Sequence, residues 1–416
     1  MSRTPRMAWR NLWRNRRRTL LTLVAIAFGL FLAIFFTALQ DRSFADMIDD
    51  AARLSSGHVQ VAHPDYLENP SLTKTLPEAQ ALAEQVRQVK GVERVAVRIS
   101  GPTMVSTAEG SYGAFFQAID PAAETVDSFY YLDSVDEGEM LQPGDTRGVV
   151  LGKRLARNLG VELGDKVVYR LMDKHGEITA GLGRVRGLAS SGSPSVDGAL
   201  LIVNIDAVRE VLNYGPNEAT ELAVFTSDSR RSEAVASRVQ AELGDQILAS
   251  TWDEVQPDLS GFIAMKVGGA RFMEAVIMIL VAAGIFNTLF VSVMERTREF
   301  GIMLAIGWSS GQVFRLVMWE SLWLALVGVA VGGALTAPLY AYLSTHPIDL
   351  TAAMAAQGQE QLDIGGVAMS MLLRVGIFPE NLAIIVGLVV LSTLLSGLYP
   401  AWKAGSTVPV DSIKLV

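Results

Sequence analysis

Cysteine is absent from the 416-residue chain, and charged residues are scarce. Without cysteine there is no disulfide framework and no Cys-ligated metal site. Charged residues make up 19% of the chain, whereas a soluble domain usually carries about 25%. Half of the residues are hydrophobic, and the mean hydropathy is +0.31. This composition argues against a purely soluble enzyme and predicts that part of the chain lies in a membrane.

The charges that are present are unevenly distributed. The net charge is −8, but residues 41–270 hold 21 basic and 34 acidic residues, and the remainder holds 14 and 9. An acidic, water-facing block therefore lies inside a basic, apolar frame. This distribution gives no support for nucleic-acid binding, which needs a basic patch.

A phosphate-binding loop is also missing. The pattern G-x-x-x-x-G-K-[ST] does not occur, and the nearest string, Gly148–Arg154 (GVVLGKR), lacks both the spacing and the hydroxyl residue. The chain cannot by itself be a P-loop ATPase.

Long apolar runs dominate what remains. A helix of about 20 residues, rising 1.5 Å per residue, crosses a hydrocarbon core of about 30 Å, whereas a buried core helix is usually shorter. We therefore expect four membrane-spanning helices. The four charge-free segments are Thr19–Leu39, Ala275–Met294, Ser321–Leu343 and Asn381–Trp402.

The placement of the basic residues predicts how these helices are oriented. Seven arginines and no acid precede the first span, whereas Arg374 is the basic residue between spans three and four. Because cytoplasmic loops are enriched in Lys and Arg, we expect both termini to be cytoplasmic. The predicted regions are a cytoplasmic amphipathic N-terminus (1–18), spans at 19–39, 273–294, 316–343 and 381–402, extracytoplasmic regions at 40–272 and 344–380, a cytoplasmic loop at 295–315 and a cytoplasmic tail (403–416).

The N-terminal region has two alternative interpretations. Its apolar stretch is too long for a signal-peptide core, and no small-residue cleavage site follows Leu39, so we interpret it as an uncleaved anchor. Trp9 and Trp13 lie among the arginines, as expected for a short amphipathic helix at the membrane surface. The alternative is a solvated basic tail.

The extracytoplasmic region, 40–272, is long enough to have its own core. Its two ends each read as strand–helix–strand: His58–Ala62, a helix from a Thr75–Glu78 capping box to about Lys90, and Val92–Ser100; then Glu221–Thr226, Arg230–Leu243 and Ile247–Ser250. Between them, about 147–205, short strands and Gly/Ser turns indicate a β-rich insertion. The segment Ser190–Pro194 reads as a mobile tip. The predicted fold class is membrane α-helical plus an extracytoplasmic α+β domain: an α/β layer whose two halves close on each other, with the β-rich insertion.

Isolated polar residues offer few candidate sites. A metal site at His58 and His63 is possible on spacing, but surface or turn histidines fit better. The acidic run Asp133–Glu139 lacks EF-hand spacing, so we expect a solvated loop. Glu274, Glu320 and Arg271 lie at the edges of spans, where snorkelling to the interface explains them better than a proton relay does.

The loop between spans two and three is the most informative string, ERTREFGIMLAIG. As a helix it places Phe300, Met303, Leu304 and Gly307 on one side, where an amphipathic helix can dock into a groove of a partner. Glu295 and Glu299 are like charges four apart, unfavourable unless a partner or Arg298 compensates them. The plainer alternative is a connecting turn with basic topology signals.

This string resembles the coupling helix of the FtsX-like or MacB/LolC/LolE-type ABC transporter permeases. The resemblance extends to the basic WRNLWRNRRRTLLT start, to LGKRLARNLGVELGDKV (Leu151–Val167) in the outside domain, and to the tail YPAWKAGSTVPVDSIK. The sequence departs from the family at Leu304, where members often carry Lys or Arg, and at Gly405, where Ala is usual. It is most similar in architecture to the lipoprotein-releasing LolC/LolE branch.

The resemblance implies a porter-like α/β layer with an inserted Sabre-like subdomain, and a dimer of permeases, homo- or heteromeric, in the bacterial inner membrane. Two ATPase subunits would bind ATP and Mg²⁺, so this chain would hold no catalytic residue, metal or cofactor of its own. The expected cargo is a lipoprotein or lipid-like molecule, with a periplasmic acceptor or adaptor as a possible partner. The residues that the resemblance implies for ATPase coupling are Glu295, Arg296, Arg298, Glu299, Phe300, Gly301, Met303, Leu304 and Gly307.

Other functions remain open at this point. One is efflux of peptide- or macrolide-type substrates. Another is a non-transporting transducer that activates a cell-wall hydrolase. A third, an ATP-independent membrane receptor, is disfavoured by the coupling-helix string. No residue identifies the cargo.

Overall fold

A computed structural model describes residues 4–244, 246–350, 363–364, 366–368 and 372–408. The chain divides into two compact units. We call the first the helical unit: it comprises the chain up to Ser43, Ala264–Leu350 and the chain from Leu372 onward. The second, the sheet unit, comprises Phe44–Ile263 and Thr351–Met371.

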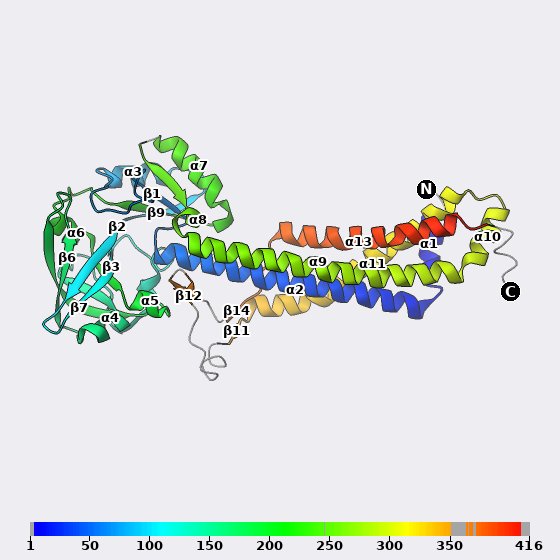
Figure 1. Cartoon of the computed structure of the whole chain (residues 1–416), viewed down its shortest axis with the longest axis horizontal. Helices are drawn as coiled ribbons and strands as arrows, with labels where there is room; N and C mark the ends of the chain where they lie inside the picture. The colour runs from blue at the N-terminus through cyan, green and yellow to red at the C-terminus, as the bar shows by residue number, and fades with distance from the viewer. Residues whose placement is uncertain (1–3, 245, 351–362, 365, 369–371, 409–416) are drawn as a thin grey trace. The chain divides into compact units, whose positions relative to one another are not determined.

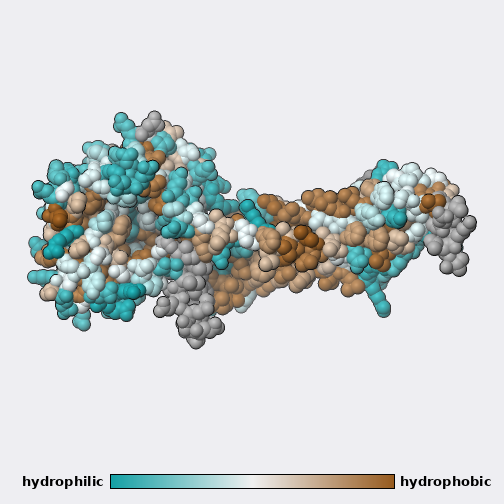
Figure 2. Space-filling view, in the orientation of Figure 1, coloured by the Kyte–Doolittle hydropathy of each residue, from teal (hydrophilic) through white to brown (hydrophobic). Residues whose placement is uncertain are grey.

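Four long helices carry the predicted spans (Figure 1). Each charge-free segment lies within one of them, and all four are long and apolar enough to cross a membrane. Exposed side chains such as Leu21 (72%) and Ile279 (67%) give them an apolar surface, brown in Figure 2. The four helices are α2 (Arg16–Leu54), α9 (Pro257–Glu295), α11 (Ser310–Thr345) and α13 (Pro379–Gly405).

Small residues allow α2 and α11 to approach closely. A Cβ on Gly328 would lie 2.5 Å from a methyl of Ile26, and one on Gly332 would lie 3.1 Å from the backbone of Ala27. Such contacts favour helix association where no hydrophobic effect drives it. α2 and α11 therefore approach closely at these glycines, and larger side chains such as Ile26 and Leu30 are buried in the same core.

The predicted N-terminal helix is present as α1 (Thr4–Leu12). The ring of Trp9 packs edge-on against Trp323 of α11, with centroids 5.2 Å apart, and Trp323 Nε1 donates to the Pro5 carbonyl at 3.1 Å. α1 is thus packed on a membrane helix, which excludes the alternative of a merely solvated tail.

The sheet unit is built on one mixed ten-stranded sheet (Figure 1). The strand order is β10-β1-β9-β2-β3-β8-β5-β7-β4, with β6 pairing β2 and β7. The pairs β3–β8 and β5–β7 are parallel, and the others are antiparallel. The strands are β1 (Val59–Ala62), β2 (Val92–Ser106), β3 (Ser111–Ile119), β4 (Val135–Gly138), β5 (Gly148–Gly152), β6 (Lys166–Met172), β7 (Ile178–Ala189), β8 (Leu200–Asn204), β9 (Glu221–Thr226) and β10 (Leu248–Thr251).

Shorter elements complete both units. The helices are α3 (Ala79–Arg87), η1 (Tyr130–Asp133), α4 (Lys153–Leu159), α5 (Pro194–Asp197), α6 (Ile205–Leu212), η2 (Ser229–Arg231), α7 (Ser232–Leu243), α8 (Trp252–Val255) and α10 (Thr297–Ala305). The two-residue strands are β11 (Ile348–Asp349), β12 (Asp363–Ile364), β13 (Val367–Ala368) and β14 (Leu372–Leu373).

The two predicted strand–helix–strand units do close on each other. Their strands interleave as β10-β1-β9-β2, all antiparallel. Helices α3 and α7 contribute Ala83 and Val235 to a core shared with Val61, Val95 and Val224. The α/β layer is thus confirmed, and the β-rich part follows it in the same sheet.

The β-rich part begins earlier than its predicted start near 147. β2 continues through Gly101-Pro102 to Ser106, and the unpredicted strand β3 pairs with it from Ile99 onward. We predicted that the strand ends at Ser100, and the next two residues, Gly101 and Pro102, are typical of a turn. Eight paired positions with β3 keep this segment extended, although proline offers no donor.

Two local predictions are wrong. Thr75 does not cap a helix: its hydroxyl donates to Glu218 at 2.6 Å, Leu76 forms an isolated bridge with Ala219, and α3 starts later and ends at Arg87. The Ser190–Pro194 segment is not a mobile tip, since Ser191 and Ser193 are buried (3% and 0% exposed).

Asp197 explains the order of that segment. Its carboxylate accepts hydrogen bonds from the Ser191 backbone and hydroxyl and from the Ser190 hydroxyl. A run of serines and glycine is typical of a mobile loop, but here Asp197, six residues beyond Ser191, orders it, and Asp363 accepts from the Ser193 hydroxyl.

The candidate polar sites also differ from the predictions. His58 is buried (5% exposed), with Nε2 against Asp49 and Nδ1 accepting from the Thr226 N–H, so it is not a surface histidine. Within the described ranges no cluster of three His, Asp or Glu is arranged to hold a metal. The acidic run contains β4, whose Asp136 and Glu137 pair with Lys153.

Candidate functional site

The loop between the second and third long helices folds into a short helix with defined ends. α9 ends at Glu295, Arg296 leaves helical geometry (φ −102°, ψ 10°), and α10 follows. Gly307 ends this turn at φ +103°, a conformation that side chains other than glycine rarely adopt. Ser309 then caps α11 in a capping box with Gln312.

One face of α10 packs against the protein's own helices. Phe300 and Gly301 are buried, and Met303 and Leu304 are partly buried. They lie in a cluster with side chains of α9, α11 and α13: Val293, Val313, Val317, Ala401 and Ala404. The predicted apolar side exists, but it faces inward, so our prediction that this side docks into a partner is wrong.

The opposite face of α10 is the accessible one. Arg298 and Ala305 are exposed, as are Ile302 (47%) and Ile306 (72%). Their three- and four-residue spacing places them along one side of the helix. Gly307 is exposed beyond the end of α10 and serves the turn, not the apolar face to which we assigned it.

Arginines from the N-terminal segment hold the acidic residues of this loop. Arg14 pairs with Glu299, and Arg18 pairs with Glu295. Arg296 also reaches Glu299, with Nε 3.1 Å from the carboxylate. The two glutamates are therefore compensated, as the sequence required, but by Arg14, Arg18 and Arg296 and not by Arg298.

The central ion pair of the site is buried. Arg296 Nη1 lies 2.9 Å from Glu320 Oε2, Asn11 donates to Glu320 Oε1 at 2.8 Å, and the guanidinium lies over the Phe300 ring at 5.1 Å. Glu320 is 9% exposed, so it does not snorkel to the interface as we predicted. Spacing in the sequence could not reveal this network, because Asn11 lies in α1, Arg296 caps α10 and Glu320 lies in α11.

The surroundings also perturb the titration of this network. Burial alone would raise the pKa of Glu299, but hydrogen bonds from Arg14 and Arg296 outweigh it and hold the pKa below its usual range. The hydrogen bond to Glu299 raises the pKa of Arg14. At neutral pH the loop is therefore held by ionised partners. Beside it lies a cavity of about 320 Å³, lined by Arg14, Arg18 and Arg296 among others.

Glu274, at the other end of the predicted second span, accepts a hydrogen bond from Thr37 at 3.0 Å. The contact joins α9 to α2 within the helical unit.

Comparisons with known families match both parts of the chain. The sequence model of the MacB-like periplasmic core domain matches residues 19–242, more than half of the chain. The model of the FtsX-like permease C-terminal region matches residues 271–409, which include the loop described above.

Relatives of known sequence include ABC transporter permeases. The chain is 24% identical to an uncharacterized ABC transporter permease of Methanocaldococcus jannaschii, over 78% of this chain and 80% of that protein. It is 24% identical to the lipoprotein-releasing system transmembrane protein LolC of Xylella fastidiosa, over 66% of each. It is 25% identical to the pyoverdine export ATP-binding/permease protein PvdT of Pseudomonas putida, over 84% of this chain. The chain spans just under two thirds of LolC and 54% of PvdT.

Two solved structures match at low similarity. The extracellular domain of the transporter YknZ from Gram-positive bacteria is 14% identical, with a TM-score of 0.34, over 46% of this chain and 99% of that one. The periplasmic region of MacB from Actinobacillus actinomycetemcomitans is 12% identical, with a TM-score of 0.35, over 51% and 96%.

Proposed function

The chain belongs to the family of ABC transporter permeases that carry a MacB-like periplasmic core domain and an FtsX-like C-terminal region, and we propose that it couples ATP hydrolysis in a separate ATPase subunit to movement of its sheet unit outside the cytoplasm. An ABC permease requires an ATPase partner. The number of ATPase copies, two, and the pairing with a second permease are part of the proposal.

The observation that carries the proposal is the exposed face of α10. Ile302 and Ile306 present apolar surface on a helix fixed from behind by Phe300 and by the Arg296–Glu320 pair. An exposed apolar side chain next to polar ones suits a protein contact. We propose that the ATPase contacts Arg298, Ile302 and Ile306, and that the other predicted coupling residues position α10.

Continuous helices provide the means of transmission. α2 and α9 each have 39 residues and contribute to both units. At 1.5 Å per residue each is about 58 Å long, more than the ~30 Å of a hydrocarbon core. A displacement of α10 reaches α9 through the Arg296 turn and continues along the helix.

The proposed setting is the bacterial inner membrane with both termini in the cytoplasm. The seven N-terminal arginines support this orientation through the positive-inside rule, and α10 then faces the ATP-containing compartment. ATP and Mg²⁺ bind the partner, and no cofactor binds this chain directly.

For the cargo, we propose a lipoprotein or lipid-like molecule released from the membrane, with a periplasmic acceptor or adaptor as a further partner. The similarity to LolC supports this choice at 24% identity. The similarity to the pyoverdine export protein PvdT supports efflux of a peptide- or macrolide-type substrate as the second candidate. A transducer of a cell-wall hydrolase is the third.

The coupling proposal is tested by replacing Ile302 and Ile306 with aspartate. Stimulation of the partner ATPase by the permease in lipid nanodiscs should fall at least tenfold, because two charges would be buried in the contact. Val408→Asp, at another exposed apolar position (54%), is the control and should retain stimulation. Normal stimulation by the double variant would overturn the assignment.

The cargo proposal is tested separately. The complex is trapped with a hydrolysis-deficient ATPase, and co-purifying molecules are identified by mass spectrometry. Acylated protein supports lipoprotein release, whereas a peptide siderophore or a cell-wall hydrolase supports the second or third candidate.

A further inference from the structure

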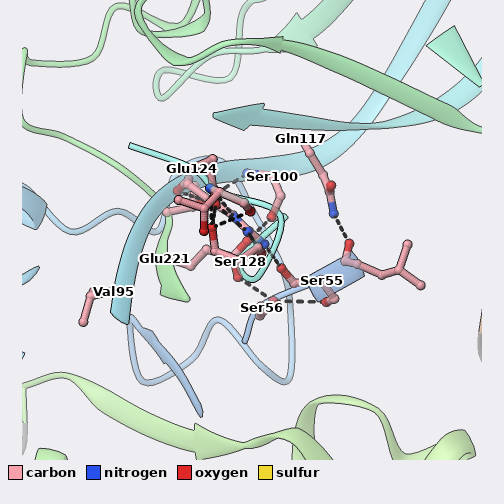
Figure 3. Close-up of polar contacts among 12 residues, drawn as sticks. Ser55, Ser56, Val95, Ser100, Gln117, Glu124, Ser128 and Glu221 are labelled. Atoms are coloured by element: carbon pink, nitrogen blue, oxygen red, sulfur yellow. Dashed lines mark hydrogen bonds and ion pairs between the residues drawn. The ribbon is translucent and has the colours of Figure 1, made fainter. Parts of the chain in front are cut away.

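Buried polar groups gather in the sheet unit where α2 ends (Figure 3). Arg98 of β2 is fully buried, and its guanidinium binds Glu124 (Nε to Oε1, 2.8 Å) and the backbone carbonyls of Ser55 and Ser128. Glu221 of β9 is the cross-strand partner of Arg98 in the sheet register and is 2% exposed. The cluster therefore contains two buried carboxylates and one buried arginine.

Glu221 is held by neutral donors. The hydroxyls of Ser56 and Ser100 and the amide of Gln60 donate to its carboxylate. Arg98 directs its hydrogen bonds to Glu124 and to carbonyls instead. A buried carboxylate without a cationic partner is unfavourable, and a carboxylate has capacity for about four hydrogen bonds. Glu221 can accept a further, positively charged donor.

A cavity of about 190 Å³ reaches this carboxylate. We call it the polar chamber. Its lining includes Glu221, Gln60, Ser100 and Tyr66, whose hydroxyl donates to the Ser100 carbonyl. Burial raises the pKa of Tyr66, so the phenol stays neutral there. Glu221 is the charged side chain among the described residues that line it.

A second cavity of about 410 Å³ adjoins the first, and we call it the apolar chamber. The two share Ser55, Phe115 and Gln117 in their walls. The apolar chamber is lined mainly by carbon and has no charged side chain among its described lining residues, which include Leu54, Tyr131, Val196, Leu200 and Val367. Its volume lies in the usual range of small-molecule sites.

Two amide oxygens in the chamber walls lack a partner in the described part of the chain. They are Oε1 of Gln117 and Oε1 of Gln256. The assignment of oxygen and nitrogen is fixed by chemistry, because Gln117 Nε2 must donate to the Leu54 carbonyl (2.6 Å) and Gln256 Nε2 to that of Ala51. Gln117 is 7% exposed and lines both chambers.

The buried side-chain atoms that lack a partner in the chamber walls, and the carboxylate of Glu221 beside them, are therefore acceptors, one of them anionic. We propose that the two chambers form one binding site for an amphipathic amine. Its ammonium group binds Glu221 beside Gln117, and its apolar part fills the apolar chamber. This proposal goes beyond the coupling function and does not depend on whether the ligand is cargo or regulator. The site lies wholly within the sheet unit.

Photolabelling of the full chain tests the site. The probe is a ten-carbon primary amine bearing a diazirine, added to the protein in nanodiscs of zwitterionic lipid, and the labelled residues are mapped by mass spectrometry. Label is expected within residues 115–131 and 194–200. Octylamine should compete at least tenfold better than octanoate, with neutral octanol between them, because a hydrogen bond to a charged group is worth more than a neutral one.

Two variants separate charge from space. Glu221→Gln keeps a hydrogen-bonding side chain and should weaken competition by octylamine about tenfold or more, with octanol little changed. Ala199→Phe places a large side chain in the apolar chamber, whose lining does not include Glu221. It should abolish the labelling that octylamine competes with. If Glu221→Gln does not fold, the competitor series on the natural protein still decides the charge preference.

Label confined to the membrane helices, or no label because only water enters the chambers, would overturn the proposal. Equal competition by octylamine and octanoate would also overturn the proposal. ATPase stimulation by the labelled preparation is measured in parallel, so a failed ligand site is distinguishable from failed coupling.

Discussion

Both units contain a buried arginine over a phenylalanine ring, and they differ in how its charge is balanced. In the helical unit Arg296 lies 5.1 Å from the centroid of Phe300, and in the sheet unit Arg98 lies 5.1 Å from that of Phe129. Around Arg296, two carboxylates meet a second cation, Arg14. Around Arg98, the two buried carboxylates are those of Glu124 and Glu221, and the cation beside both is Arg98.

The difference separates two uses of buried charge. A balanced network, in which each carboxylate contacts a cation, fixes geometry, in this case the position of α10. An unbalanced cluster next to a cavity retains capacity for a cation from outside the chain. Removing single charges should therefore affect the two units differently.

The largest effect is expected for Arg98→Met. Glu124 and Glu221 would remain buried with no cation, and the carbonyls of Ser55 and Ser128 would lose their donors. We expect a loss of about 3–5 kcal/mol in the sheet unit, measured by hydrogen exchange of β2 and β9. Arg94→Met on the same strand is the control, because Arg94 is 3.9 Å from the exposed Asp127 and should cost little. Equal effects of the two variants would contradict the central role of Arg98.

Arg296→Met should have a smaller effect on stability and a large one on coupling. It leaves Glu320 buried without its cation, and we expect about 3 kcal/mol of local destabilisation, seen as faster hydrogen exchange in α10, with loss of ATPase stimulation. Adding Glu320→Leu should restore the exchange protection, since a buried pair can be replaced by apolar residues, but not the stimulation. Restoration of both would show that the pair has no positioning role.

The pH dependence of the balanced network comes next in size. The pKa of Glu299 is lowered from 4.5, so its stabilising contribution is complete above that value and is lost as the pH falls through the folded-state pKa. The part of the exchange protection of α10 that Glu299 contributes should decline as the pH falls below 4.5. In Glu299→Gln this decline should be weaker. An unchanged profile would assign the decline to other carboxylates.

The smallest effect is expected at the turn after α10. Gly307→Ala meets no atom within 4 Å, so its cost is the strain of φ +103° alone, about 1–2 kcal/mol. Gly311→Ala is the matched control: it also meets nothing, but it lies inside α11, where alanine is favoured. A lower melting temperature for the first variant only would confirm the turn, and equal melting temperatures would contradict it.

Sequence reasoning reached the fold where the signal is periodic or long. Charge-free runs located α2, α9, α11 and α13, and alternating residues located β1, β9 and the paired α/β halves. It failed where a tertiary contact decides: β2 passes through Gly101-Pro102 because β3 pairs with it, and Asp197 orders a serine loop. No local pattern contains that information.

The candidate site shows the same limit. The sequence located α10 and the need to compensate Glu295 and Glu299, because spacing determines which residues are neighbours on a helix. It assigned the apolar face to the wrong side, because Phe300 and Leu304 look the same whether they meet a partner or Val313 and Ala401. It singled out Glu320 but missed its hydrogen bond with Asn11, because the two residues are about 310 positions apart.

Helix α2, which contributes to both units, provides a thermodynamic link between helix movement and ligand binding in the chambers. Its hydrogen-bonded backbone ends at Leu54, and the Leu54 carbonyl is held by Gln117, a residue that also lines both chambers. If a shift of α2 changes the shape of that wall, it changes the binding free energy of a ligand in the chambers. By linkage, the ligand then changes the free energy of the shift by the same amount. Occupancy of the chambers and ATP binding in the proposed partner would then each report on the other, without any solute passing between them.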